Sequence, residues 1–145
     1  RKLPECYRVA MKLQKYLLVD GFGSCVDEKH MENVRERYGF TNLITTLRKS
    51  ISASDNGWSG AVCSESGLYQ GSGYNLHIVD RVGGGDSFAA GFLHGILTHM
   101  EPDRALEFAL AAAAIKHTIP GDLNYISEEE VLTLMNSDGS GRVNR

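Results

Sequence analysis

Short apolar segments rich in β-branched and aromatic residues fill the first half of the chain and are typical of strands. This pattern predicts strands at 16–19, 42–47, 58–64, 67–70 and 77–79. One amphipathic helix interrupts them, from the capping residue Asp27 through Tyr38, and Gly39 ends it. The polar, Ser-rich segment 48–56 is predicted to be a loop.

Apolar residues follow a helical period in the second half. Helices are predicted at 85–99 and 101–117, and a third begins at the capping box formed by Ser127 and Glu130. Strands followed by helices of crossover length predict an α/β layered domain. The first 16 residues show a weaker helical pattern, and 138–142 are expected to form a flexible end.

Composition excludes several classes of protein. Hydrophobic residues make up 42% of the 145 residues and charged residues 23%, as in ordinary folded domains. The longest apolar run, 108–115, is shorter than the roughly 20 residues of a membrane span, and the first residues show no secretory signal. A net charge of -3 argues against nucleic acid or an anionic membrane as a partner. The three cysteines, Cys6, Cys25 and Cys63, show no disulfide or metal-site spacing. We therefore expect a cytoplasmic protein.

Candidate chemistry concentrates in the segment 79–91, V-D-R-V-G-G-G-D-S-F-A-A-G. Gly83, Gly84 and Gly85 lie between a strand that ends in Asp80 and a helix that begins near Asp86. Glycines allow close approach to the backbone, and free amides at a helix N-terminus bind anions. A carboxylate in that first turn could accept a proton from an attacking hydroxyl during phosphoryl transfer. A simple N-cap after a glycine turn is the alternative. The spacing fits neither the P-loop nor the dinucleotide-binding pattern.

The motif resembles the carboxyl-terminal signature of PfkB/ribokinase-type sugar kinases, usually written D-T-x-G-A-G-D-x-F-x-x-G. Segments 45–48, 52–58 and 116–122 are similar to the 2-keto-3-deoxygluconate kinase subgroup, and the likeness is good from about Arg37 onward. It implies a ribokinase-like layered sheet with flanking helices. Residues 1–145 would be the carboxyl-terminal portion, a partial kinase domain with the nucleotide-binding and catalytic-base half.

The resemblance also implies roles for particular residues. Asp86 would be the base that deprotonates the sugar hydroxyl, and the amides of Gly83–Gly85 would stabilise the transferred phosphoryl group. Four residues, Thr46, Leu47, Arg48 and Leu110, would contact ATP. Leu110 stands where many relatives have an Asn near the adenine, which would leave adenine recognition mostly apolar or weak.

Three further residues fall at the substrate or cation side of the implied site. Asp122 would lie near the sugar, with a solvated loop acid as the alternative. Arg81 replaces the Thr of the wider family and would reach a phosphate or the substrate carboxylate. Asp80 would help to hold a monovalent cation, or would be a strand-end hydrogen-bond partner.

The implied activity is ATP-dependent phosphorylation of the terminal hydroxyl of a sugar acid, 2-keto-3-deoxygluconate, to its 6-phosphate. ATP and Mg²⁺ would be required, K⁺ is left open, and no dedicated metal cage is expected.

The alternatives are fructokinase- or ribokinase-type specificity and a non-catalytic nucleotide-binding module. The partners would be ATP and a small sugar acid, without nucleic acid or membrane, and a homo-oligomer formed through the family's lid stays open. The chain lacks the family's N-x-x-E motif near 18–26, so by itself it is expected to bind ATP-Mg weakly and to turn over little.

Overall fold

The computed structural model of the protein describes residues 16–20, 26–52 and 54–137. The predictions for the first 15 residues and for 138–142, and two of the three cysteines, Cys6 and Cys25, lie outside the described residues. The third, Cys63, is a buried free thiol.

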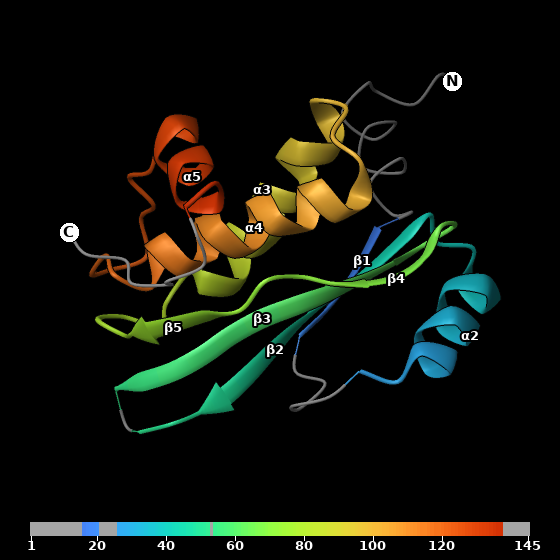
Figure 1. Ribbon diagram of the computed structural model, residues 1–145, viewed down its shortest axis with the longest axis horizontal. Coiled ribbons are helices and arrows are strands. Elements are labelled where there is room, and N and C mark those ends of the chain that lie inside the picture. The colour runs from blue at the N-terminus through green and yellow to red at the C-terminus, as the bar shows by residue number, and fades with distance from the viewer. Residues whose placement is uncertain (1–15, 21–25, 53, 138–145) are drawn as a thin grey trace, which may run out of the picture.

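The described strands form one five-stranded sheet (Figure 1). They are β1 (Tyr16–Asp20), β2 (Asn42–Ser50), β3 (Asp55–Ser64), β4 (Gly67–Gln70) and β5 (Tyr74–His77). Strand β1 runs parallel to β2, β2 is antiparallel to β3, and β4 and β5 both pair antiparallel with β3. The predicted hairpin of 58–64 and 67–70 is confirmed by the β3–β4 pairing.

The predicted loop at 48–56 is wrong over most of its length. The ladder between β2 and β3 continues outward to the pair Ser50 and Asn56. A short turn then closes the hairpin, where Ser52 Oγ donates to Asp55 Oδ2 at 2.7 Å. The polar composition that suggested a loop reflects exposure at the end of this ladder, because residues 48–50 are exposed.

The four helices within the described residues follow local start and stop signals. They are α2 (Glu28–Tyr38), α3 (Gly84–Leu97), α4 (Pro102–Lys116) and α5 (Glu128–Met135). The Asp27 carboxylate caps α2, and Gly39 ends it in a left-handed conformation with φ 67°. The capping box of Ser127 and Glu130 is present at the start of α5. Both predicted caps are therefore confirmed.

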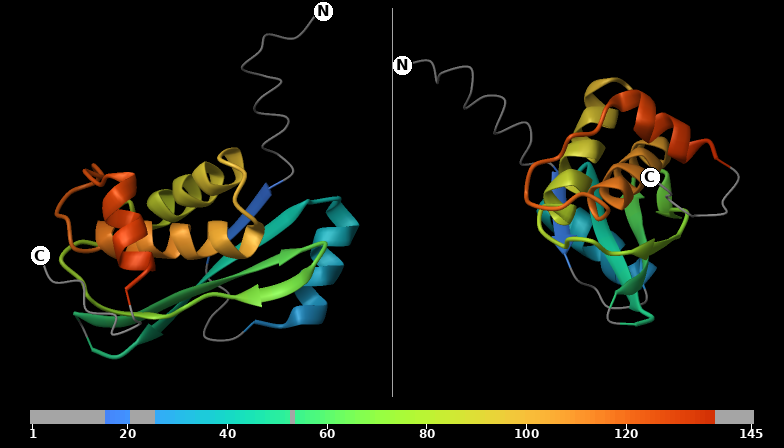
Figure 2. Two further views of the ribbon diagram at one scale, coloured as in Figure 1. Left: turned by 45° about the horizontal axis from the view of Figure 1, so that its top comes forward. Right: turned by 90° about the vertical axis from the view of Figure 1, so that its left-hand side faces the viewer.

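The sheet lies between α2 on one side and α3, α4 and α5 on the other, as Figures 1 and 2 show. An apolar cluster fills each side. Alternate strand residues point to opposite faces. Leu43 and Cys63 pack with Met31 of α2, whereas Ile44 and Val62 belong to the core beneath α3 and α4. This arrangement confirms the predicted α/β layered class.

Helices α3 and α4 are antiparallel and approach closely through small residues. A Cβ atom built on Gly91 would lie 2.9 Å from Ala109 Cα, and one built on Gly95 would lie 2.7 Å from Ala105 Cβ. Because the two helices run in opposite directions, the start of α3 lies beside the end of α4. The segment with the candidate chemistry therefore rests on the carboxyl end of a buried helix.

Candidate active site

The glycine segment forms the amino end of α3. Gly83 is the N-cap residue, with φ 77°, a left-handed conformation that favours glycine. The amino end of α3 has no side-chain cap. The first helical hydrogen bond runs from the Ser87 amide to Gly83 O at 2.9 Å. Asp86 lies in the first turn and is exposed, and no atom lies within 4 Å of a Cβ built on Gly85. Gly85 and the Asp86 carboxylate thus face open space, whereas Gly84 is buried and its amide lies 3.5 Å from Arg81 O.

The carboxyl end of α4 carries this segment. The carbonyl oxygen of His117 accepts hydrogen bonds from the amides of Val79 at 2.9 Å and Asp80 at 3.2 Å. The strand predicted at 77–79 lies instead at Tyr74–His77. The Ile78 amide still donates to Ser54 O at 2.7 Å, and from Val79 onward the chain docks on α4. The His117 ring lies against Gly84, where a built Cβ would be 2.5 Å from its Cε1.

The Asp80 carboxylate joins the segment before α3 to the segment after α4. Its Oδ1 accepts from the Val82 amide at 3.0 Å, and its Oδ2 accepts from the Gly121 amide at 2.8 Å. The amide of Val82, followed by that of Gly121, holds the pKa of the Asp80 carboxyl below its usual value. Asp80 is thus a hydrogen-bond partner of two backbone amides, although β5 already ends at His77, and its role at a monovalent cation stays a prediction.

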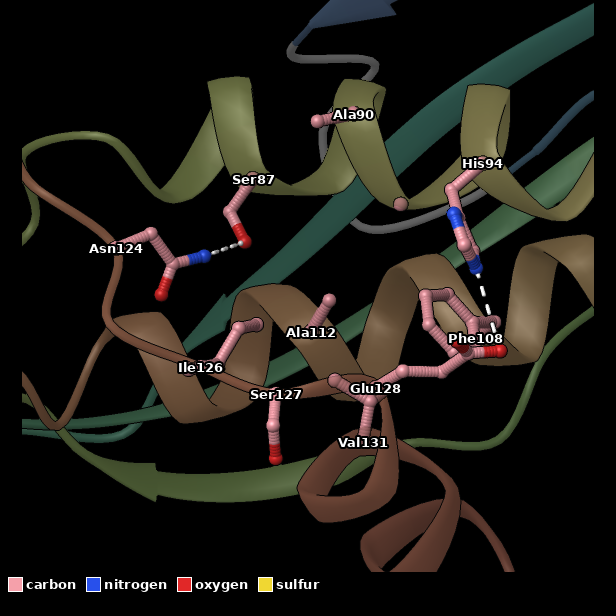
Figure 3. A pocket seen from close by; sticks show the side chains of 11 residues that line it. Ser87, Ala90, His94, Phe108, Ala112, Asn124, Ile126, Ser127, Glu128 and Val131 are labelled. Atoms are coloured by element: carbon pink, nitrogen blue, oxygen red, sulfur yellow. Dashed lines mark hydrogen bonds and ion pairs between the residues drawn. The ribbon is translucent and has the colours of Figure 1, made fainter.

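The segment after α4 lies against the glycines. The carbonyl oxygen of Asp122 would be 2.9 Å from a Cβ built on Gly83, so only glycine fits there. Asn124 Nδ2 donates to Ser87 Oγ at 2.8 Å and fastens the segment to α3 (Figure 3). The structure brings the Asp122 backbone beside Gly83 and leaves the residue exposed. Its role near the sugar stays a prediction.

A cavity of about 260 Å³ is lined by Ser87 and by residues of α3, α4 and α5. Its apolar walls include Phe108 and Val131, and His94 Nε2 lies 3.4 Å from Glu128 Oε1 at its far end (Figure 3). Asp86 and the three glycines do not line it. The cavity is thus separate from the site that the motif predicts.

Two arginines add positive charge around the glycines. The Arg48 guanidinium lies over the Trp58 ring, 5.3 Å from its centroid, and that ring lies 4.9 Å from His117. The Asn56 side-chain amide is oriented so that its oxygen accepts two hydrogen bonds from the Arg81 guanidinium, at 3.0 and 3.2 Å. Residues on β2, on β3 and before α3 thus meet at one end of the molecule.

Three predicted ATP contacts have buried side chains. Thr46 is 2% exposed and Leu47 is 3% exposed, so both residues, backbone included, are almost wholly covered, whereas Arg48 is exposed. Leu110 is 0% exposed and packs beneath Gly60 and Gly71. A direct contact between Leu110 and adenine does not fit this position, because the side chain fills the core between α4 and β3.

Sequence reasoning missed the roles of Lys116 and His117. Both are buried, at 0% and 2% exposure, although Lys is almost never fully buried without a partner. The segment 116–122 is singled out only by its resemblance to the kinase subgroup, which gives neither residue a role. A Lys-His pair closing an Ala-rich, otherwise apolar helix was the available signal.

His117 is held in one tautomer. Its Nδ1 lies 2.6 Å from Ala113 O, and because a carbonyl only accepts, Nδ1 carries the proton. Burial lowers the pKa of His117, and the charges of Arg48, Lys116 and Arg81 lower it further, against the Ala113 hydrogen bond, which raises it. The ring is therefore neutral near pH 7.

This lowered pKa predicts acid destabilisation. The unfolded chain takes up a proton near the ordinary pKa of 6.5 and the folded protein does not, so the stability is complete above pH 6.5 and is lost as the pH falls. Denaturant unfolding between about pH 5 and 8 should show this slope in the wild type. The His117→Gln variant should lack it, and a flat wild-type profile would contradict the assignment.

Two absences concern only the described part of the chain. No helix there is both long and apolar enough to cross a membrane. Within the same residues, no three His, Cys, Asp or Glu side chains gather as a metal-binding cluster.

Comparisons with known proteins agree with this geometry. The structure is similar to the crystal structure of 2-dehydro-3-deoxygluconokinase from Thermotoga maritima, with a TM-score of 0.76, 35% identity, and coverage of 90% of this chain and 45% of that one. A 2-dehydro-3-deoxygalactonokinase of Haloferax volcanii is 30% identical over 86 residues, 59% of this chain and 27% of that protein. An ATP-dependent ribose-1-phosphate kinase of Halopiger xanaduensis is 42% identical over 66 residues, 45% of this chain and 22% of that protein.

The chain therefore spans less than half the length of these relatives. The profile of the pfkB family carbohydrate kinases matches residues 55–128, which contain the glycine segment, its docking site on α4 and Asp122. That match covers just over half of the chain, and the protein belongs to the pfkB family of carbohydrate kinases.

Proposed function

We propose that the complete protein containing these residues transfers the γ-phosphoryl group of ATP to the terminal hydroxyl of a sugar acid, 2-keto-3-deoxygluconate. The observation that carries the proposal is the exposed Asp86 carboxylate in the first turn of α3, next to the uncapped amide end formed by Gly83–Gly85. Family membership and the names of two relatives support the substrate class.

Each part of the site has a task in this reaction. Asp86 takes the proton of the sugar hydroxyl as its oxygen attacks the γ-phosphorus. The new O–P bond forms while the bond to the leaving ADP oxygen breaks. The amides of Gly83–Gly85, helped by the α3 dipole, stabilise the charge on the transferred group. Arg48 adds positive charge from the end of β2, where the strand backbone is the proposed contact for ATP.

The substrate side is assigned to Asp122 and Arg81. Asp122 is exposed beside Gly83 and can accept hydrogen bonds from sugar hydroxyls. Arg81 is a guanidinium with the donor geometry that carboxylates and phosphates match. A sugar that carries a carboxylate therefore suits this end of the molecule better than a neutral sugar.

Magnesium fits the residues present as a metal carried in by the nucleotide. Mg²⁺ prefers oxygen ligands, keeps several waters, and is often bound by one or two carboxylates and the substrate phosphates. Asp86 and Asp122 are the exposed carboxylates that would hold it through water. When bound, the metal neutralises phosphate charge.

A coupled assay of ADP production on the complete protein tests the substrate. We expect kcat/KM for 2-keto-3-deoxygluconate to exceed that for fructose and ribose by about 10-fold or more, because a lost pairing to a buried or oriented charge costs at least about 1.4 kcal/mol. Ribose 1-phosphate belongs in the panel because one relative bears that name. A preference for a neutral sugar would contradict the sugar-acid assignment. ATP binding without turnover of any sugar would support a non-catalytic nucleotide-binding module instead.

A further inference from the structure

A fully buried lysine lies directly behind the glycine segment. Lys116 is 0% exposed at the last residue of α4. Its side chain runs beneath Gly83, where a built Cβ would lie 3.1 Å from Lys116 Cε. Burying a lysine is costly unless its charge is compensated by partners, so its surroundings identify its role.

The partners of Lys116 are backbone oxygens. Nζ donates to Ile119 O at 3.1 Å and to Gly121 O at 2.7 Å. The Asp80 carboxylate belongs to the same cluster, since it accepts from the Gly121 amide, and the Lys116 charge lowers its pKa. Two carbonyl oxygens with a nearby carboxylate form the kind of oxygen cage that otherwise holds an alkali cation.

This cage joins the two halves of the site. On one side Asp80 holds the Val82 amide, immediately before the glycines. On the other side Gly121 precedes Asp122, whose carbonyl lies against Gly83. The Lys116 ammonium group thus holds the 119–121 turn directly, and this turn holds Asp80 through the Gly121 amide, behind Gly83.

We propose that Lys116 is the built-in cation of this site, a positioning residue whose ammonium group replaces a bound alkali ion and sets the conformation of the glycine segment. The K⁺ that the resemblance left open does not fit, because the oxygens that would coordinate it already accept hydrogen bonds from Nζ. The positioning part of the proposal rests on the proposed kinase function.

Salt exchange on the complete protein tests the inference without relying on turnover. The thermal midpoint of the wild type and its affinity for ADP, measured by calorimetry, should be the same in KCl and in tetramethylammonium chloride at equal ionic strength. A wild-type midpoint or affinity that requires K⁺ would overturn the proposal. Loss of ADP binding in both salts would instead contradict the proposed function, while the thermal midpoint still tests Lys116.

The variant Lys116→Ala creates the vacancy that an alkali ion could enter. In tetramethylammonium chloride it should bind ADP about 10-fold more weakly, the order expected for one lost charge-assisted hydrogen-bond pair. Adding KCl should raise both its thermal midpoint and its ADP affinity, since K⁺ can take the freed carbonyl oxygens. Equal loss in both salts would show a merely structural lysine and overturn the proposal. Lys29→Ala, which removes an exposed lysine of α2, is the matched control and should respond like the wild type.

Discussion

Replacing Asp86 by Asn should lower kcat by about 10²- to 10⁴-fold while ATP still binds, because a positioned general base contributes this much to a transfer step. Asn keeps the shape and the hydrogen-bonding oxygen of the side chain but cannot accept the hydroxyl proton at neutral pH. Because the side chain is exposed in the first turn of α3, the substitution leaves no buried group without a partner. Steady-state kinetics on the complete protein, with a separate measurement of ATP affinity, separates the two effects.

A matched control is available in the neighbouring helix. Asp103 is also an exposed acid in the first turn of its helix, and it lies at the opposite end of the α3–α4 pair. Asp103→Asn removes the same favourable interaction with a helix dipole, about 0.3–1 kcal/mol, without touching the glycine segment. Its kcat should match the wild type. Turnover of the Asp86→Asn enzyme within about 10-fold of the wild type would remove the base assignment, since that loss is below the range for such catalysis.

Two adjacent glycine substitutions should differ in their effect on stability. Gly84→Ala should lower the free energy of unfolding by about 1–3 kcal/mol, the usual cost of overpacking. Its new methyl group would lie 2.5 Å from Cε1 of His117. That ring cannot easily move away, because Nδ1 is bonded to Ala113 O and the ring face packs on Trp58. The displaced ring would also disturb the amides beside Asp86.

Gly85→Ala is the control, because it adds the same methyl group one residue later. No atom lies within 4 Å of its new methyl group, and its φ is not in the left-handed region. Its unfolding free energy should stay within about 0.5 kcal/mol of the wild type. ATP affinity should nevertheless fall, because the methyl enters the open space that the phosphates are proposed to occupy. Denaturant unfolding and ATP titration of both variants check the pair, and equal stability of the two would show that His117 does not support Gly84.

The local elements could be foreseen from residues that are neighbours along the chain. Asp27 and Gly39 delimit α2, and the capping box starts α5, because caps and helical periodicity depend on interactions within a few residues. The exposed acid at the start of α3 follows from the same kind of signal. The position of the proposed site at the start of α3 can therefore be predicted from the glycine motif alone.

Long-range packing decided the rest. β5 ends at His77 and the Val79 and Asp80 amides turn to the carbonyl of His117, some forty residues away, where periodicity alone favoured a strand. Leu110 became core because the sheet lies over it. Lys116 donates to oxygens three and five residues further along the chain, but its contact with Gly83 exists only because the end of α4 packs against the glycine segment. Such contacts join residues that are far apart in the sequence, and the local pattern of residue types does not specify which of them pack together.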